Sequence, residues 1–347
     1  MLIILGGSSP WTVDLIERLE PDAAVLVGRD SAALVALRRF LRKRSRTKVE
    51  LSRDPRRALE EASVVLCQAR IGGWPGRRED EFAPLTWGAY GDETLGIGGL
   101  RSALRASTTL AEWASYAPDA PTVMLSNPTD LLTRWWQSHS RAPTISVCEA
   151  PTELMLGLPP GSRYLGVNHL GWALTPEGQR IPSRWLPLAT NPAGWVRRRS
   201  RTGHRADELR ILSQALKHAI AAEDHERFDA LIKRRVPRWY EAIVVPVLRS
   251  LLDGTSFRGI VGLPNDGVLP AISRGVIVER LTNLMGAGGE LPEELVQEVS
   301  TLAHSRQLAW EVMLDPTEER LARYTEADPF STGARYPADL LSWIVGA

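Results

Sequence analysis

The sequence is poor in cysteine and carries almost no net charge. Cys67 and Cys148 are the only cysteines among its 347 residues, too few for a disulfide scaffold and in keeping with a reducing compartment. The 42 basic and 41 acidic side chains nearly cancel, so nothing global indicates binding to nucleic acid or to an anionic membrane. Residues 1–5 lead straight into glycines without the basic segment of a signal peptide, and no apolar run is as long as a membrane span. We therefore expect a cytoplasmic protein without nucleic-acid or membrane partners.

The first half of the sequence alternates between short apolar runs and segments with helical periodicity. The runs at residues 2–5, 23–27, 63–68, 122–125 and 144–147 predict strands, and helices are expected at 12–19, 32–43, 99–114 and 129–138. Uniformly apolar strands separated by helices are typical of a parallel sheet that is covered on both faces. The pattern predicts an α/β fold with a Rossmann-type domain over residues 1–158.

Beyond residue 158 the pattern becomes mixed. Strands are expected at 164–167, 258–263 and 275–279, a hairpin or irregular strand region at 172–183, and helices at 207–222, 225–232, 241–252 and 291–313. We predict a mixed α+β domain over residues 159–347. No linker separates the two halves, so we expect the domains to pack directly, with a site in the cleft between them.

A glycine loop follows the first expected strand. Gly6, Gly7, Ser8 and Ser9 lie between that strand and the helix that starts at Thr12. Such a loop directs backbone N–H groups towards the pyrophosphate of a dinucleotide, and we predict that these five residues bind the cofactor. Ser8 replaces the second spaced glycine of the full fingerprint, so an ordinary strand-to-helix turn is the alternative.

The end of the second expected strand reads Gly28-Arg29-Asp30. In dinucleotide-binding folds this position normally carries an acidic residue for the ribose hydroxyls. Arg29 suits a 2′-phosphate and hence NADP, whereas Asp30 suits the plain ribose of NAD. A charged surface turn is the third interpretation.

Four further clusters hold polar residues and glycines, and all but the second start where an expected strand stops. Ligands bind at that edge of open α/β sheets. The clusters are Arg70-Ile71-Gly72-Gly73 with Arg77; Gly91 to Gly99; Ser126-Asn127-Pro128; and Cys148-Glu149-Ala150-Pro151 with Asn168-His169-Leu170-Gly171-Trp172.

Together with Gly6 to Thr12 and Arg205-Ala206-Asp207-Glu208, these clusters resemble glycoside hydrolase family 4. This family contains the NAD- and metal-dependent 6-phospho-glucosidases, α-galactosidases and glucuronidases. The matches follow the family order from residue 2 to about residue 280 and include Val261 to Gly267. The resemblance implies a fold similar to lactate and malate dehydrogenases, and a homodimer or homotetramer.

The resemblance also implies roles for individual residues. Cys148 and His169 would hold a divalent metal, typically Mn²⁺. Arg77, Asn127, Asn168 and Arg205 would contact the sugar or its phosphate. Glu149 stands where some members carry an acid catalyst. Glu93, in the glycine-rich signature, is either catalytic or fixes its loop.

In the family mechanism, NAD takes a hydride from C3 of the sugar, a base removes the C2 proton, and the leaving group departs before the hydride returns. This is the NAD-dependent exception to two-carboxylate glycoside hydrolysis. The metal would polarise the C3 carbonyl.

One departure concerns the base. The family's tyrosine precedes the Arg205 segment by about twenty residues, and ungapped counting reaches Trp185, whose indole is only a donor. His204 is an alternative base because its ordinary pKa suits the task, although a surface histidine is the simpler interpretation.

Three functions therefore stay open at this point. The first is a family 4-like glycosidase that uses bound NAD, or NADP, and a metal on a sugar or sugar phosphate. The second is an NAD(P)-dependent sugar oxidoreductase or epimerase. The third is a non-catalytic protein that binds the sugar and the dinucleotide.

Overall fold

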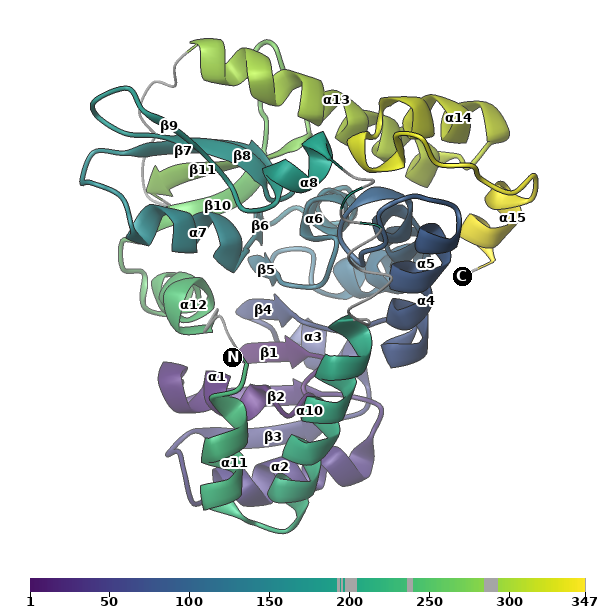
Figure 1. The fold of residues 1–347 in the computed structure, drawn as a ribbon. Coiled ribbons are helices and arrows are strands. Elements are labelled where there is room, and N and C mark those ends of the chain that lie inside the picture. Colours follow the sequence, from purple (N-terminus) through teal and green to yellow (C-terminus); the bar gives the residue numbers. More distant parts are fainter. Residues whose placement is uncertain (192–193, 195, 197–204, 236–239, 284–292, 347) are drawn as a thin grey trace.

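The computed structural model describes residues 1–346 except 192–193, 195, 197–204, 236–239 and 284–292. One large sheet passes through the molecule (Figure 1). Its strands are β1 Leu2–Leu5, β2 Ala23–Val27, β3 Lys48–Ser52, β4 Val64–Cys67, β5 Thr122–Met124, β6 Thr144–Ser146, β7 Arg163–Val167, β8 Leu170–Leu174, β9 Arg180–Pro182, β10 Arg258–Pro264 and β11 Ile277–Asn283.

Helices lie between and around these strands. In the first part of the chain they are α1 Thr12–Leu19, α2 Ser31–Leu41, α3 Pro55–Glu60, α4 Gly73–Thr86, α5 Gly96–Tyr116, α6 Thr129–Gln137 and α7 Glu149–Leu156. Further on they are α8 Leu186–Thr190, α10 Arg205–Ala221, α11 His225–Ile232, the π-helix η1 Tyr240–Val244, α12 Val245–Asp253, α13 Glu293–Leu314, α14 Glu318–Ala327, the 3₁₀-helix η2 Pro329–Ser331 and α15 Leu340–Val345.

The strand order is β3-β2-β1-β4-β5-β6-β10-β11-β7-β8-β9. The first six strands are parallel, and the pairs from β6–β10 onward are antiparallel. Parallel strands need long crossovers, which the helices provide. This arrangement confirms the expected α/β class with a parallel Rossmann-type sheet followed by a mixed part.

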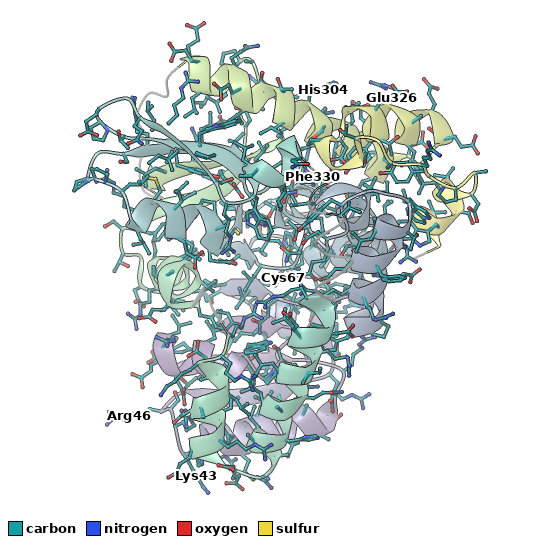
Figure 2. All side chains as sticks on the ribbon, viewed as in Figure 1. Lys43, Arg46, Cys67, His304, Glu326 and Phe330 are labelled. Carbon is teal, nitrogen blue, oxygen red and sulfur yellow. The ribbon has the colours of Figure 1, made fainter. Side chains whose placement is uncertain are left out.

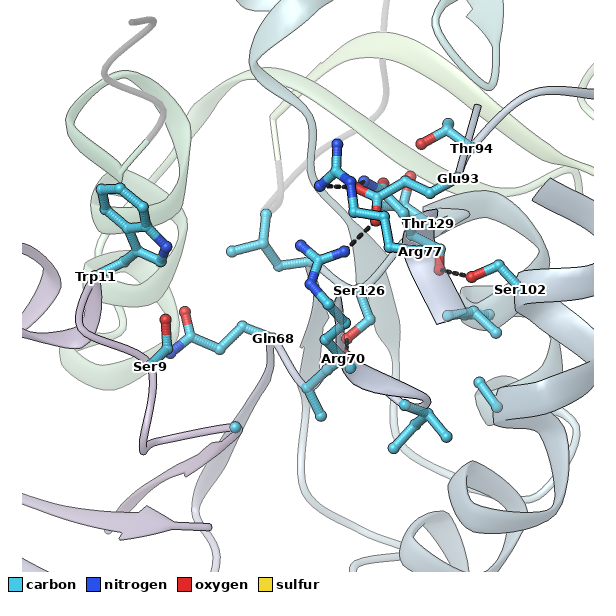
Figure 3. A pocket seen from close by; sticks show the side chains of 18 of the residues that line it. Ser9, Trp11, Gln68, Arg70, Arg77, Glu93, Thr94, Ser102, Ser126 and Thr129 are labelled. Atoms are coloured by element: carbon cyan, nitrogen blue, oxygen red, sulfur yellow. Dashed lines mark hydrogen bonds and ion pairs between the residues drawn. The ribbon is translucent and has the colours of Figure 1, made fainter. Parts of the chain in front are cut away.

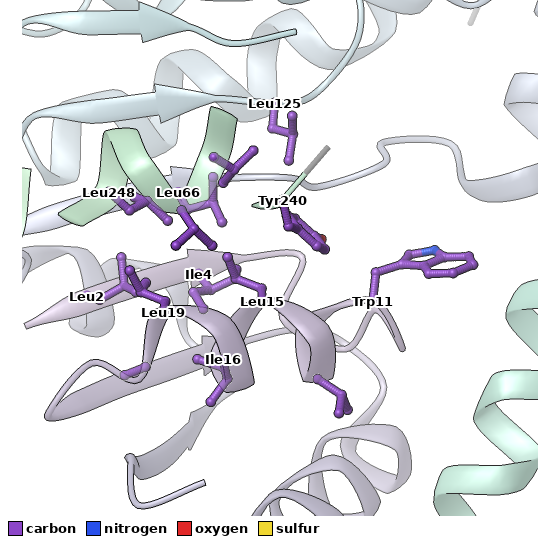
Figure 4. Close-up of a cluster of buried hydrophobic side chains, with 14 of the residues drawn as sticks. Leu2, Ile4, Trp11, Leu15, Ile16, Leu19, Leu66, Leu125, Tyr240 and Leu248 are labelled. Carbon is purple, nitrogen blue, oxygen red and sulfur yellow. The ribbon is translucent and has the colours of Figure 1, made fainter. Parts of the chain in front are cut away.

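The core explains why the central strands are uniformly apolar. Every residue of β1 and β4 is buried, because helices cover both faces of the parallel sheet. On one face, Leu2 and Ile4 pack with Leu15 of α1 and with Leu248 of α12 (Figure 4). Helices from the second half of the chain thus cover strands from the first half.

The expected strands are all present, with small shifts at their ends. The segment at 172–183 is a hairpin of β8 and β9, and β11 begins two residues after Gly275, which has a left-handed φ of 80°. The sequence pattern did not predict β3, α3, α4, α7, α8, α14, η2 or α15. The helix expected at 241–252 starts as a π-helix, and Pro246 lies in the first turn of α12, where a missing N–H costs little.

The division into domains of residues 1–158 and 159–347 stays a prediction. The sheet crosses that boundary through the β6–β10 pair, and α10 packs on α2 and α4. Within the described residues, no helix combines the length and apolarity needed to cross a membrane.

Candidate functional site

A cavity of about 1200 Å³ opens at the carboxyl ends of β1, β2, β4, β5 and β6, the expected ligand edge of such sheets. Its volume exceeds that of ordinary small-molecule pockets and suits a dinucleotide together with a second ligand. It brings together most of the residues predicted from the sequence. Those that line it are Gly6, Ser8, Ser9, Arg29, Asp30, Arg77, Glu93, Asn127, Cys148, Glu149, His169 and Arg205.

Four predicted residues are not among those that line the cavity. Gly7 packs against β2, where an added Cβ would lie 2.7 Å from Leu26 Cα. Thr12 is buried and accepts a hydrogen bond from Gln68 Nε2 at 2.9 Å. Asn168 is buried and donates to the Thr94 carbonyl at 3.0 Å. His204 lies outside the described residues. Gly7, Thr12 and Asn168 therefore support the cavity wall from behind.

The glycine loop forms one end of the cavity, which we call the glycine-loop end. Gly6 has a φ of 82°, and a Cβ there would lie 2.8 Å from Ala69 Cα, so only glycine fits. The N-terminus of α1 has no side-chain cap. The Thr12 and Val13 N–H groups donate instead to the Ser9 and Pro10 carbonyls at 3.1 and 3.4 Å, so the loop and the helix form one continuous turn. In Figure 3, Ser9 and Trp11 lie on the side of the cavity opposite Arg77 and Glu93.

Cys148 and His169 define the other end, the Cys–His end. Cys148 precedes α7 and its Sγ lies 3.6 Å from His169 Nε2. His169 and Asn168 form the turn between β7 and β8 with φ values of 72° and 45°. Two left-handed non-glycine residues cost conformational energy. The two-residue loop of the β7–β8 hairpin requires positive φ at both positions, and this turn places the imidazole.

Glu279 of β11 fixes the imidazole from behind. Its Oε1 lies 3.3 Å from His169 Nδ1, and both of its oxygens accept the His169 backbone N–H at 3.0 and 3.1 Å. Glu279 is buried. A carboxylate on Nδ1 leaves Nε2 free to bind a metal, the arrangement that orients metal-binding histidines in proteins. Nothing in the sequence pairs Glu279 with a residue 110 positions away, and the sequence analysis missed it.

The Cys148–His169 pair fits a metal. Metal–sulfur and metal–nitrogen bonds of about 2.3 and 2.1 Å at a tetrahedral angle place the two donor atoms about 3.6 Å apart, which is the spacing observed. Burial raises the pKa of the Cys148 thiol to about 11, so a thiolate there calls for a cation beside it. Among the described residues, no group of three or more His, Cys, Asp or Glu side chains gathers at one metal position. Two protein donors would leave coordination positions open for substrate oxygens.

Glu93 lies between two arginines in the same cavity. Arg70 and Arg77 both form ion pairs with it, the latter at 2.6 Å, and Asn127 Nδ2 donates to it at 3.1 Å (Figure 3). Burial alone would raise the pKa of Glu93, but the two guanidinium groups outweigh it and lower that pKa to about 2. A carboxylate held ionised in this way favours the loop-fixing interpretation over acid–base catalysis.

The same network anchors the start of α10. Glu81 Oε1 accepts from Arg77 Nε at 2.8 Å, and Glu81 Oε2 accepts from the Ala206 N–H at 2.9 Å. The neighbouring Arg205 thereby reaches the cavity, although its own guanidinium pairs with Glu208 at 3.1 Å.

Asp92 is a cavity residue that the sequence analysis did not assign. Burial, followed by the charges of Glu81 and Glu93, raises the pKa of Asp92 to about 6. The signal was present in the sequence, because three successive polar residues follow Gly91. The pKa depends on charges from separate segments, so it could not be read from the sequence.

Glu149, the predicted acid, and Trp185, which stands at the position of the family's tyrosine base, lie in the same cavity. Glu149 Oε1 lies 3.5 Å from a guanidinium nitrogen of Arg184, and the Trp185 ring lies 6.4 Å from the His169 ring. Both residues line the cavity. An indole therefore lies near the imidazole at the Cys–His end.

Comparison with known proteins supports the resemblance. Residues 12–158 match the family described as "Family 4 glycosyl hydrolase". The "6-phospho-alpha-glucosidase 1" of Lacticaseibacillus paracasei is 33% identical over 136 residues, which are 34% of this chain and 30% of that relative. The chain thus aligns with less than a third of that relative's length.

Solved structures extend the likeness to the whole fold. The 6-phospho-beta glucosidase of Thermotoga maritima, at 19% identity, covers 99% of this chain and 97% of its own. TM-scores are 0.84 for its form with NAD and glucose-6-phosphate and 0.80 for its form with manganese, NAD⁺ and glucose-6-phosphate. Malate dehydrogenase of Cryptosporidium parvum, at 14% identity, gives a TM-score of 0.53 and covers 90% of this chain and 98% of its own. The predicted resemblance to family 4 glycosyl hydrolases is thus confirmed over residues 12–158, and the whole chain has the fold of the solved 6-phospho-glucosidase structures.

Proposed function

We propose that the protein is a dinucleotide- and metal-dependent enzyme that acts on a glycoside of a sugar or sugar phosphate. The observation that carries this proposal is the single cavity that joins the glycine loop to the Cys148–His169 pair. The relatives crystallised with NAD, manganese and glucose-6-phosphate support the same set of ligands. Redox-assisted elimination is the reaction that this set serves, because a bound dinucleotide supplies reversible hydride transfer and the metal supplies carbonyl polarisation.

The charges of the cavity favour an anionic substrate. Of the residues that the structure describes, nine arginine or lysine residues line the cavity against four aspartate or glutamate residues, so its lining carries more positive than negative charge. Guanidinium groups bind phosphate with two hydrogen bonds. We assign Arg70 and Arg77 to the phosphate or carboxylate of the substrate, and Asn127 and Glu93 to holding them in place.

Two carboxylates of the cavity can move protons. Asp92, with a pKa of about 6, exchanges a proton close to neutral pH, where acid–base catalysts work best. Glu149 lies directly after Cys148 and beside Arg184, which places a carboxylate at the Cys–His end. We assign proton transfer to these two groups and orientation of His169 to Glu279.

A second candidate is a sugar oxidoreductase or epimerase, and Trp185 favours it. The indole lies 6.4 Å from the His169 ring and cannot accept a proton. An enzyme of this kind keeps the hydride step and releases no leaving group. Trp185→Tyr separates the candidates, because a gain in glycoside cleavage supports the elimination reaction.

The test is cleavage of the α and β forms of 4-nitrophenyl 6-phospho-glucoside with Mn²⁺, reductant and either NAD⁺ or NADP⁺. Release of nitrophenol that is lost in Cys148→Ser and kept in Cys67→Ser supports the glycosidase. Cys67 is the matched control because it lies in the core, outside the residues that line the cavity (Figure 2). Reduction of the dinucleotide by glucose-6-phosphate without nitrophenol release supports the second candidate. If the wild-type protein forms neither nitrophenol nor reduced dinucleotide, both candidates are contradicted.

The oligomeric state and the cytoplasmic location stay predictions.

A further inference from the structure

Among the described residues of the glycine-loop end, no acidic residue is placed to receive a ribose. The position at the end of β2 is Gly28, whose N–H donates to the Ser52 carbonyl at 3.1 Å. A Cβ on Gly28 would lie 2.9 Å from Ser8 Oγ and 3.0 Å from Ser8 Cβ. Ser8 therefore occupies the space that a side chain at position 28 would need. Ser8 and Gly28 both depart from the dinucleotide-binding fingerprint, and because Ser8 fills the space beside Gly28, the two positions have to change together.

The nearby carboxylates cap the N-termini of helices instead. Asp30 caps α2, where its Oδ1 accepts the Ala33 N–H at 3.0 Å. Asp54 caps α3 and accepts the Arg57 N–H at 3.3 Å. An N-cap carboxylate is held by the helix that it starts. Neither acidic residue that follows β2 or β3 is thus placed as a free acceptor for two ribose hydroxyls.

Three cations surround this end of the cavity. Arg29 follows β2, Arg53 follows β3, and Lys217 lies on α10, which packs on α2; all three line the cavity. Asp30 also lines the cavity, and its carboxylate lies 3.6 Å from Lys217 Nζ. The local balance is therefore positive, although the whole chain is almost neutral. Arginine beside the end of β2 is the feature that accommodates a 2′-phosphate.

We propose that the glycine-loop end selects a dinucleotide whose adenosine ribose carries a 2′-phosphate, so that the cofactor is NADP rather than NAD. Arg29 binds the phosphate, with Arg53 and Lys217 adding positive charge from β3 and α10. Gly28 and Ser8 together exclude the carboxylate that would favour an unmodified ribose. This inference rests on the proposed function, because it presumes that the cavity takes a dinucleotide.

The test measures binding and needs no turnover. Dissociation constants of NADP⁺ and NAD⁺ are determined by calorimetry on the wild-type protein. We expect NADP⁺ to bind about tenfold or more tightly than NAD⁺, since charge-assisted bonds to phosphate are strong, and the preference to shrink as salt is added. Arg29→Gln should remove most of the preference while leaving NAD⁺ affinity unchanged.

The control is Arg46→Gln, which removes an equal charge at the exposed lower edge of the molecule, outside the cavity (Figure 2), and should leave both constants unchanged. A double variant with Ser8→Gly and Gly28→Asp should reverse the preference towards NAD⁺. Equal or tighter binding of NAD⁺ to the wild-type protein would overturn the inference and leave the proposed function intact. If the wild-type protein binds neither NADP⁺ nor NAD⁺, the proposed function itself is overturned.

Discussion

The glycine-loop end of the cavity is made of backbone groups and exposed charged side chains, whereas the Cys–His end is made of buried and half-buried side chains from distant segments. Gly6, Gly28 and Arg29 lie within one βαβ unit. The half-buried Cys148 contacts the buried His169, which contacts the buried Glu279, and the three residues come from distant segments. The first end can thus change its ligand preference by single surface substitutions. The second cannot change without disturbing buried contacts.

The largest expected effect comes from the buried network next to the Cys–His end. Glu93→Ala leaves Arg70 without its partner carboxylate and Arg77 with Glu81 alone. Arg70 is exposed, but Arg77 is buried, and a buried charged group that loses one of its two partners is costly, so we expect a loss of about 2 kcal/mol or more in the free energy of unfolding. Urea denaturation at pH 7 measures it. The comparison variant is Asp30→Ala, which removes a carboxylate at the glycine-loop end. If Glu93→Ala loses less unfolding free energy than Asp30→Ala, the proposed difference between the two ends is wrong.

The same carboxylate gives a pH dependence with a definite sign. The pKa of Glu93 is lowered from 4.5 to about 2 in the folded protein. Its stabilisation is therefore complete above pH 4.5 and is lost as the pH falls towards 2, a component of about 3 kcal/mol. Glu93→Gln should lack this component, so its stability should fall less than that of the wild type over the same range. Parallel pH profiles for the two proteins would contradict the ion-pair network.

A smaller effect is expected behind His169. Glu279→Gln keeps the shape of the side chain but removes the charge that orients the imidazole. Loss of such a partner weakens metal binding by about 10- to 100-fold, which titration with Mn²⁺ would measure. Dinucleotide affinity should not change. If Mn²⁺ binds equally well to the variant, the positioning role of Glu279 is wrong.

The smallest effect is expected at the glycine-loop end. Asp30→Ala removes the N-cap of α2, which costs about 1 kcal/mol of stability. Thermal unfolding would detect this loss, and Mn²⁺ affinity should stay at the wild-type value. A change in Mn²⁺ affinity would mean that the two ends are coupled more closely than their separate contacts indicate.

The two ends also differ in how far the sequence could predict them. The glycine loop and the end of β2 depend on residues close together in the chain, so Gly6 and Arg29 were recognised from local patterns. Cys148 and His169 were found only through the resemblance to a family. Glu279 gave no signal, because its role depends on the pairing of β11 with β7, which brings Glu279 opposite Gly166. The pKa of Asp92 likewise depends on Glu81 and Glu93 together.

Secondary structure was likewise predicted well where it depends on a local pattern and missed where it does not. Buried strands such as β1 and β4 are uniformly apolar and were predicted closely. The strand β3 was missed because it lies at the edge of the sheet, where its residues are exposed or half-buried. The helix α4 was missed because it begins at Gly73 and contains Pro84, and both residue types normally interrupt helices.

The central claim is that one cavity holds a metal at Cys148 and His169 and a dinucleotide at the glycine loop. Its most direct test is the electron paramagnetic resonance of Mn²⁺ titrated with the protein, together with dinucleotide binding in the same samples. The account predicts that the wild type removes the signal of free Mn²⁺, that Cys148→Ser does not, and that both bind NADP⁺ with the same affinity. Undiminished Mn²⁺ binding by both Cys148→Ser and His169→Ala would contradict it.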